Sequence, residues 1–122
     1  MNKTINQIFL IIVMAICAYS YPQYNNNVPN GNSIPPSAVA LGHPNGNTKH
    51  YTQFAQDYKL NGYQWTKKLC LIDSDNDGQS NGLEMGDPCC NYVVGTMPLF
   101  TSGLSDPNNP QSTTINTNSS CV

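Results

Sequence analysis

The chain has 122 residues, of which 39% are hydrophobic and 10% are charged, whereas about 25% of residues are charged in ordinary soluble domains. Its five basic residues are all lysines, and seven acidic residues give a net charge of −2. A chain of this charge without arginine lacks the phosphate contacts that nucleic-acid binding requires, so the composition argues against a nucleic-acid partner. The length allows one small domain and excludes a dinucleotide-binding half, a kinase lobe or a barrel.

Residues 1–20 are predicted to form a cleaved secretory signal peptide. Lys3 gives a short positive start, residues 8–18 form an unbroken apolar run, and residues 18–20 have the small-x-small pattern of a cleavage site. Because a membrane-spanning helix needs about 20 apolar residues, this run is too short to span a bilayer. We therefore expect a secreted, extracellular protein that begins at Tyr21, with no stable membrane insertion after signal cleavage. The alternatives are a buried hydrophobic helix and an uncleaved anchor.

Cleavage changes the cysteine and charge balance of the chain. Cys17 leaves with the signal, so five cysteines become four, the even number that a secreted disulfide framework requires. The mature chain then has four lysines and seven acids, a net charge of −3, and four of the acids fall within residues 73–84. Outside that window the mature chain has a charge of +1. The acidity is therefore local and indicates a cation site rather than a generally acidic surface.

The mature chain is predicted to begin with a turn-rich stretch and to continue with two short helices. Residues 21–48 are rich in Pro, Gly and Asn, with turns expected at Asn30-Gly31 and Asn45-Gly46. Apolar residues then recur at helical spacing from His50 to a stop at Asn61-Gly62, and again within residues 63–72. The apolar faces of both helices are the candidate core. They are formed by Tyr51, Phe54 and Tyr58 in the first helix and by Trp65, Leu69 and Ile72 in the second.

Residues 73–84 match the calcium loop D-x-D-x-D-G-x-x-N-x-x-E at every ligand position. Calcium is a hard cation that takes about six to eight oxygen ligands, and alternate carboxylates on a tightly turning backbone supply them. Gly78 permits the sharp bend. Gln79 is expected to act through its main-chain carbonyl, and Asn81 through its side chain or a bridging water. The predicted calcium ligands are Asp73, Asp75, Asp77, Gln79, Asn81 and Glu84.

The alternative for this loop is a solvated acidic turn that binds nothing at physiological calcium. Two features separate the loop from a paired EF-hand. Ser80 stands where paired hands place an apolar residue, and Pro88 leaves no room for a full exiting helix. We therefore expect a single calcium staple in an extracellular module, with a dissociation constant in the ~10⁻⁴–10⁻³ M range of such modules, and not a switch that opens a groove.

The chain after the acidic loop is predicted to contain little regular structure. Gly86-Asp87-Pro88 ends any helix that follows the loop. Residues 91–101 favour a short edge strand or hairpin at most, because a glycine and a proline interrupt them. From Ser105 the chain is polar and is not expected to order itself, and Asn118 is a candidate glycosylation site. The predicted class is a small disulfide-stabilised, loop-rich α+β fold with one or two short helices, a calcium loop and a short β hairpin or edge strand.

The mature cysteines, Cys70, Cys89, Cys90 and Cys121, allow three disulfide pairings. A bond between the adjacent Cys89 and Cys90 would close a strained ring. That leaves Cys70–Cys90 with Cys89–Cys121, or Cys70–Cys89 with Cys90–Cys121. In both, one bridge ties the ends of the acidic loop and the other anchors the tail. A zinc site is the weaker alternative, because the C-x-x-C spacing is missing and the compartment is oxidising.

Three motifs follow one another in the middle of the chain. Residues 62–70 read G-x-x-W-T-x-x-L-C, residues 73–84 read D-S-D-x-D-G-x-x-N-G-x-E, and residues 86–90 read G-D-P-x-C. In this order they resemble the temptin family of small secreted proteins, and a weaker likeness extends outward to residues 21–107. We therefore expect a temptin-like domain over residues 21–107, followed by a polar low-complexity tail over residues 108–122.

The resemblance implies a secreted, disulfide-bonded module. The namesake of the family is a water-borne pheromone protein that acts with other secreted factors, and related modules occur beside copper monooxygenase domains. Pheromone activity itself is not carried over, because it depends on surfaces that the motifs do not align. The family has a further cysteine upstream, where residues 34–38 contain none, so its bridge pattern does not transfer as a whole. Cys90 matches the family cysteine and Cys89 does not, which favours Cys70–Cys90.

The inventory of catalytic side chains is thin, and no catalytic residue is assigned. His43 and His50 are the only histidines, and neither a nucleophile motif nor a metalloprotease motif accompanies them. Two histidines without a third ligand make a poor redox copper site. We therefore expect a non-enzymatic module with calcium as its cofactor and an extracellular protein as its partner, acting in pheromone-like signalling or protein interaction. The alternatives are a calcium-dependent matrix or cell-surface adhesion component and an accessory domain with a weak enzyme-associated role.

Overall fold

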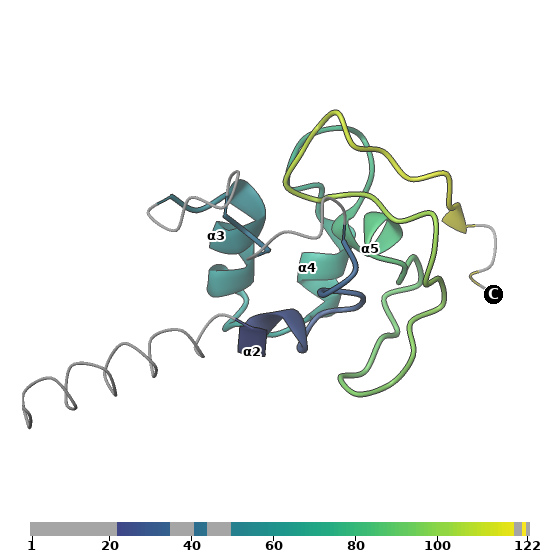
Figure 1. Cartoon of the computed structure of the whole chain (residues 1–122), viewed down its shortest axis with the longest axis horizontal. Helices are drawn as coiled ribbons and strands as arrows, with labels where there is room; N and C mark the ends of the chain where they lie inside the picture. Colours follow the sequence, from purple (N-terminus) through teal and green to yellow (C-terminus); the bar gives the residue numbers. More distant parts are fainter. Residues whose placement is uncertain (1–21, 35–40, 44–49, 119–120, 122) are drawn as a thin grey trace, which may run out of the picture.

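The computed structural model of the chain describes residues 22–34, 41–43, 50–118 and 121. The predicted signal peptide and the turn expected at Asn45-Gly46 lie outside these residues. The described part contains short helices joined by long loops (Figure 1). The helices are α2 (Pro22–Asn25), α3 (Gln53–Leu60), α4 (Lys67–Leu71) and α5 (Asn81–Glu84). Within this part, no helix has the length and apolar character needed to cross a membrane.

Helix α3 forms where the hydrophobic spacing predicted it, and its ends are fixed by local hydrogen bonds. At its start the Ala55 N–H donates to Thr52 Oγ1 (3.2 Å), the usual arrangement of an N-cap threonine. At its end the Asn61 N–H reaches the carbonyls of the last turn, so the predicted stop is confirmed. Phe54 and Tyr58 are buried, whereas Tyr51 precedes the helix and is exposed. The prediction was therefore wrong for the start of the helix, which begins at Gln53 and not near His50, and for Tyr51 as a core residue.

Helix α4 is shorter than the predicted second helix. Thr66 is its N-cap, with Oγ1 accepting the Leu69 N–H (3.1 Å). The cap fixes an extended backbone at residue 66, so Trp65 lies outside the helix although its spacing fits one. Leu69 and Cys70 carry the buried face, and α4 packs against α5.

The hydrophobic core is small and joins segments far apart in the sequence. The predicted turn at Asn30-Gly31 is present, and Asn30 Nδ2 donates to the main-chain carbonyls of Met85 (2.9 Å) and Phe100 (2.8 Å). Burying a large apolar side chain contributes about 1.5–3 kcal/mol, so a core of this size needs covalent support. Its members are Val28, Ile34, Phe54, Tyr58, Leu69 and Met85, with Leu41, Trp65, Ile72 and Leu104 packed against them.

The covalent support comes from two disulfides. Cys70 pairs with Cys90 and Cys89 pairs with Cys121, with Cα–Cα distances of 5.7 and 5.3 Å. This is the pairing that the family resemblance favours. Because two neighbouring residues bond in different directions, Cys90 takes a left-handed backbone conformation (φ 55°), which costs a non-glycine residue about 1–2 kcal/mol.

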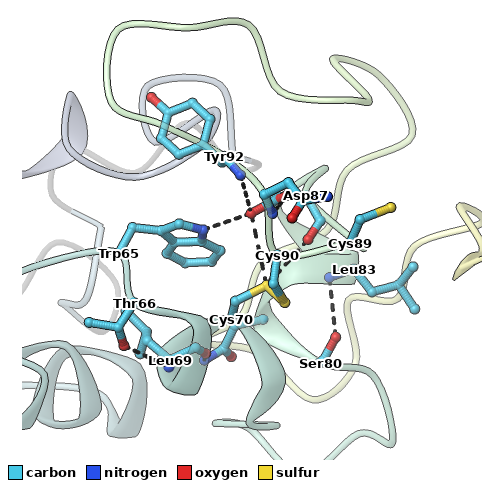
Figure 2. The surroundings of a disulfide bond; sticks show 12 residues. Trp65, Thr66, Leu69, Cys70, Ser80, Leu83, Asp87, Cys89, Cys90 and Tyr92 are labelled. Atoms are coloured by element: carbon cyan, nitrogen blue, oxygen red, sulfur yellow. Dashed lines mark hydrogen bonds between the residues drawn. A yellow bond between two sulfur atoms is a disulfide. The ribbon is translucent and has the colours of Figure 1, made fainter. Parts of the chain in front are cut away.

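Asp87 connects the buried disulfide to Trp65. Figure 2 shows the indole Nε1 of Trp65 directed at the Asp87 carboxylate beside the Cys70 sulfur. Trp65 Nε1 donates to Oδ2 (2.8 Å), and the main-chain N–H groups of Asn91 and Tyr92 donate to Oδ1 (2.9 Å) and Oδ2 (3.1 Å). Both carboxylate oxygens of the buried Asp87 therefore accept hydrogen bonds, as buried polar groups normally do. These hydrogen bonds fix the backbone of residues 87–92, immediately after α5.

The predicted β structure is absent from the described part of the chain, so the α+β class is wrong there. The main-chain hydrogen bonds that residues 91–101 make are a turn from the Thr96 N–H to Val93 O and one bond from the Phe100 N–H to Gly86 O. A ladder needs a second extended segment alongside, and none lies beside these residues. Instead the segment forms a long loop with exposed apolar side chains (Figure 1). They are Val93, Val94, Met97 and Leu99.

The segment that begins at Ser105 is more ordered than its composition predicts. Ser105, Asp106, Pro107 and Thr114 are buried. Ser105 and Thr114 make hydrogen bonds to Glu84 and Gln79, and the Cys89–Cys121 bridge ties the segment at its far end. Composition argues for disorder because few apolar side chains are present. Here hydrogen bonds and a covalent tie take the place of apolar burial.

Gly82 in α5 has no room for a side chain, which gives a test of the packing. A Cβ at this position would lie 2.2 Å from Cys70 Sγ and 2.6 Å from Asp87 O. Gly82→Ala is expected to lower the free energy of unfolding by about 1–3 kcal/mol, because the disulfide and the backbone must both move. Urea denaturation of the oxidised protein measures this. Gln56→Ala, on the exposed side of α3, should change stability by less than about 0.5 kcal/mol. An unchanged midpoint for Gly82→Ala would contradict the close approach.

Candidate cation site

The acidic loop is organised around the side chain of Asp73. Its Oδ1 accepts the main-chain N–H groups of Asn76 (2.8 Å) and Asp77 (3.2 Å), and its Oδ2 accepts that of Gly78 (2.8 Å). The turn needs left-handed backbone at Asn76 (φ 63°) and Gly78 (φ 93°), which asparagine and glycine adopt most easily. The sharp bend predicted at Gly78 is therefore present, and it folds the loop back on its first residue.

Three carboxylates gather inside this bend. Asp73, Asp75 and Asp77 each offer an oxygen, and these oxygens lie within 4.8 Å of one another. Asp77 Oδ1 accepts the Gln79 N–H (2.7 Å), but Asp77 Oδ2 and both oxygens of Asp75 are buried without a hydrogen-bond partner. Leaving a buried acceptor without a partner costs about 1–3 kcal/mol, and more when it is charged. Carboxylate oxygens without hydrogen-bond partners therefore lie close together inside the bend.

Glu84 adds a fourth carboxylate from α5. The residue is fully buried, its Oε1 accepts a hydrogen bond from Ser105 Oγ (2.8 Å), and its Oε2 is buried without a partner. The pKa of Glu84 is raised to about 8, mainly by burial; the Ser105 hydrogen bond lowers it, and the nearby charges of Asp75, Asp77 and Asp106 raise it. Burial, and then the charge of Asp77, raises the pKa of Asp75 to about 6. A hydrated hard cation can exchange its water for such a set of oxygens.

The surrounding sequence matches one family over most of its length. The family model described as Temptin C-terminal matches residues 18–109. The chain belongs to the temptin family. A curated relative named Temptin, from Aplysia californica, is 39% identical over 113 residues, which covers 87% of this chain and 90% of that protein. No solved structure matches the chain. The resemblance carried by the three motifs is confirmed, whereas the boundaries of the domain at residues 21–107 and of the tail at residues 108–122 stay predictions.

Asn81, predicted as a ligand, has a structural task in this temptin-family chain. The side chain is fully buried; Oδ1 accepts the Ser74 N–H (3.2 Å), and Nδ2 donates to Leu69 O (2.9 Å) and Ser74 Oγ (2.9 Å). Ser74 Oγ in turn donates to Asp57 Oδ2 (2.8 Å). This network attaches the loop to α3 and α4. A direct or water-bridged ligand role for Asn81 stays a prediction.

Gln79 was predicted to contribute its main-chain carbonyl, and that role also stays a prediction. Its side chain shows a contact that the sequence did not suggest. Nε2 donates to Thr114 O (2.9 Å), and Oε1 accepts the Thr114 N–H (2.7 Å). Together with Ser105, which holds Glu84, Thr114 is a residue of the site that the sequence reasoning missed. Both lie in the polar segment, where no local pattern marks them.

The remaining candidate residues lie apart from the carboxylates. His43 Nδ1 is 2.9 Å from His50 O, and its ring packs against Tyr51. Asn118 is exposed, as a glycan site requires, and its modification stays a prediction. Among the described residues, Asp73, Asp75 and Asp77 form the group of acidic, histidine or cysteine side chains close enough to share a metal ion.

The raised pKa values predict how stability depends on pH when metal is removed. The folded protein holds protons on Glu84 up to about pH 8 and on Asp75 up to about pH 6, whereas the unfolded chain releases them near 4.5 and 3.8. The stability from these protons is therefore complete below about pH 4 and is lost as the pH rises through 6 and 8.

In excess chelator, the melting temperature of the mature protein should fall between pH 5 and pH 8. Glu84→Gln, which cannot ionise, should show a smaller fall over the same range. Scanning calorimetry at constant ionic strength measures both proteins. A melting temperature that rises with pH in chelator would contradict the buried state of these carboxyl groups.

Proposed function

We propose that this temptin-family chain is a secreted, non-enzymatic module whose acidic loop binds one calcium ion and which acts by binding another extracellular protein. Secretion and signalling are supported by the family and by the two disulfides, which persist in oxidising compartments. The relative named Temptin covers most of this chain, which supports a pheromone-like role. Calcium binding is supported by the geometry of the loop.

The observation that carries the calcium proposal is the set of carboxylate oxygens without partners. Asp75, Asp77 and Glu84 together contribute four such buried oxygens. A solvated acidic turn would leave these atoms in water, and a structural ion pair would place a lysine against them. A divalent cation held by the aspartates and reached by Glu84 would give these oxygens a partner and offset their mutual repulsion.

Calcium fits this set better than magnesium does. Calcium accepts seven or so oxygens in a flexible shell, whereas magnesium requires near-octahedral geometry and keeps several waters. The carboxylates of Asp73, Asp75, Asp77 and Glu84 supply more charge than magnesium sites built by protein alone usually contain. The proposed shell is completed by the main-chain carbonyl of Gln79 and by Asn81, directly or through water. The two disulfide-bonded cysteines nearest the loop, Cys70 and Cys90, hold its ends together.

Calorimetric titration of the metal-stripped mature chain with calcium tests the site. Asp75→Asn, which keeps the shape of the side chain and removes its charge, should weaken binding at least tenfold. Gln56→Ala is the control, because Gln56 is exposed on α3 and lies outside the acidic loop, and it should change affinity by less than about threefold. An identical isotherm for the wild type and Asp75→Asn would reject the site.

The interaction role is tested by capture of partners from the surrounding medium. The immobilised mature chain should retain a soluble extracellular protein in millimolar calcium and release it in chelator, because the loop loses its order when the carboxylates repel one another. Asp75→Asn should fail to retain it. Retention of insoluble matrix or cell-surface material in place of a soluble protein would favour the adhesion alternative.

A further inference from the structure

The polar segment of residues 105–114, here called the strap, lies along the acidic loop. Figure 1 shows the two segments side by side, far from one another in the sequence. The strap contacts the loop at both of its ends, through Ser105 and through Thr114. It is therefore in a position to respond to whatever the loop binds.

The first contact is made by Ser105 to Glu84. Ser105 is almost fully buried, its Oγ donates to Glu84 Oε1 (2.8 Å), and its main-chain N–H donates to Glu84 O (3.1 Å). With Oε1 engaged in this way, the free oxygen of Glu84 is Oε2, which is buried and has no partner. Ser105 thus sets which oxygen of Glu84 is available to a cation.

The second contact is made by Gln79 to Thr114. The amide of Gln79 donates to Thr114 O (2.9 Å) and accepts the Thr114 N–H (2.7 Å), so one side chain satisfies both main-chain groups of a buried residue. Thr114 Oγ1 in turn donates to Gly103 O. Any movement of the loop at Gln79 therefore breaks two hydrogen bonds of the strap.

The strap is also tied between these contacts. The Asp106 N–H donates to Ser112 Oγ (3.0 Å), which closes a turn within the strap. Thr52, the N-cap of α3, donates through Oγ1 to Asn108 Oδ1. The strap is therefore held to itself and to α3 as well as to the acidic loop.

From these contacts we propose that cation binding by the loop and docking of the strap are thermodynamically coupled, with Ser105 and Gln79 as positioning residues. The inference rests on the proposed calcium site. Without a cation, the aspartates of the loop, whose oxygens lie within 4.8 Å of one another, repel one another, and this loosens the loop that Glu84 and Gln79 attach to the strap. With a bound cation, the Ser105–Glu84 and Gln79–Thr114 contacts are both kept. Linkage requires that an ion which favours the docked strap is itself bound more tightly when the strap is docked.

Hydrogen exchange of the oxidised mature chain, with calcium alone as the probe, tests the coupling. Calcium at saturation should slow exchange of the Ser105 and Thr114 amides at least tenfold. Gln79→Ala keeps the main-chain carbonyl and removes the contact to Thr114. It should still bind calcium, with affinity reduced about three- to tenfold, and should lose most of the calcium-dependent protection at Thr114. Ser105→Ala should weaken calcium binding by a similar factor.

Gln111→Ala is the matched control, because the side chain of Gln111 is exposed and the Gln111 main-chain N–H bonds within the strap, to Asn109 Oδ1. Its calcium affinity and calcium-dependent protection should equal those of the wild type. Calcium binding that leaves exchange in the strap unchanged would overturn the coupling and leave the proposed calcium site intact. Absence of calcium binding to the wild type would overturn both. A peptide map confirming both disulfides shows that each variant has folded.

Discussion

The structure depends on several carboxylates that lie close together. They cannot all carry a charge there unless something pairs with them. Asp73, Asp75 and Asp77 bring carboxylate oxygens within 4.8 Å of one another, and Asp75 and Asp77 have buried oxygens without partners. Mutual repulsion of these carboxylates opposes the arrangement. The backbone nevertheless keeps them there, because Asp73 fixes the bend and the Cys70–Cys90 bridge closes the surrounding loop. Closing a loop of about 20 residues contributes roughly 3 kcal/mol in the chain-entropy account, so covalent chemistry offsets part of the electrostatic cost.

Local patterns in the sequence predicted the local parts of the fold. The predicted stop at Asn61-Gly62 ends α3, and Phe54 and Tyr58 are buried as their spacing indicates. The limits of pattern reasoning show at Trp65, whose spacing fits a helix but whose indole is needed by Asp87. They show again at residues 91–101, where β-capable side chains have no neighbouring strand with which to pair.

Parts of the site formed by long-range hydrogen bonds could not be predicted in this way. The loop motif identified the carboxylates because their alternation is itself the signal. No such signal marks Ser105 or Thr114, since serine and threonine are ordinary in a polar segment and their partners lie 21 and 35 residues away. Asn81 shows the converse: a residue at a ligand position of the motif has its side chain engaged by Leu69 and Ser74.

The adjacent half-cystines have a consequence for biosynthesis. Cys89 and Cys90 are adjacent in the sequence. Cys90 nevertheless bonds to the buried Cys70, whereas Cys89 bonds to the exposed Cys121. Exchange of these two sulfurs would yield an isomer with the same mass and the same number of bridges. That isomer would draw Cys89 toward the interior and release the left-handed turn at Cys90. Oxidation must therefore distinguish two neighbouring thiols, and thiol–disulfide exchange through a mixed disulfide is the chemical route by which the wrong isomer would convert to the native one.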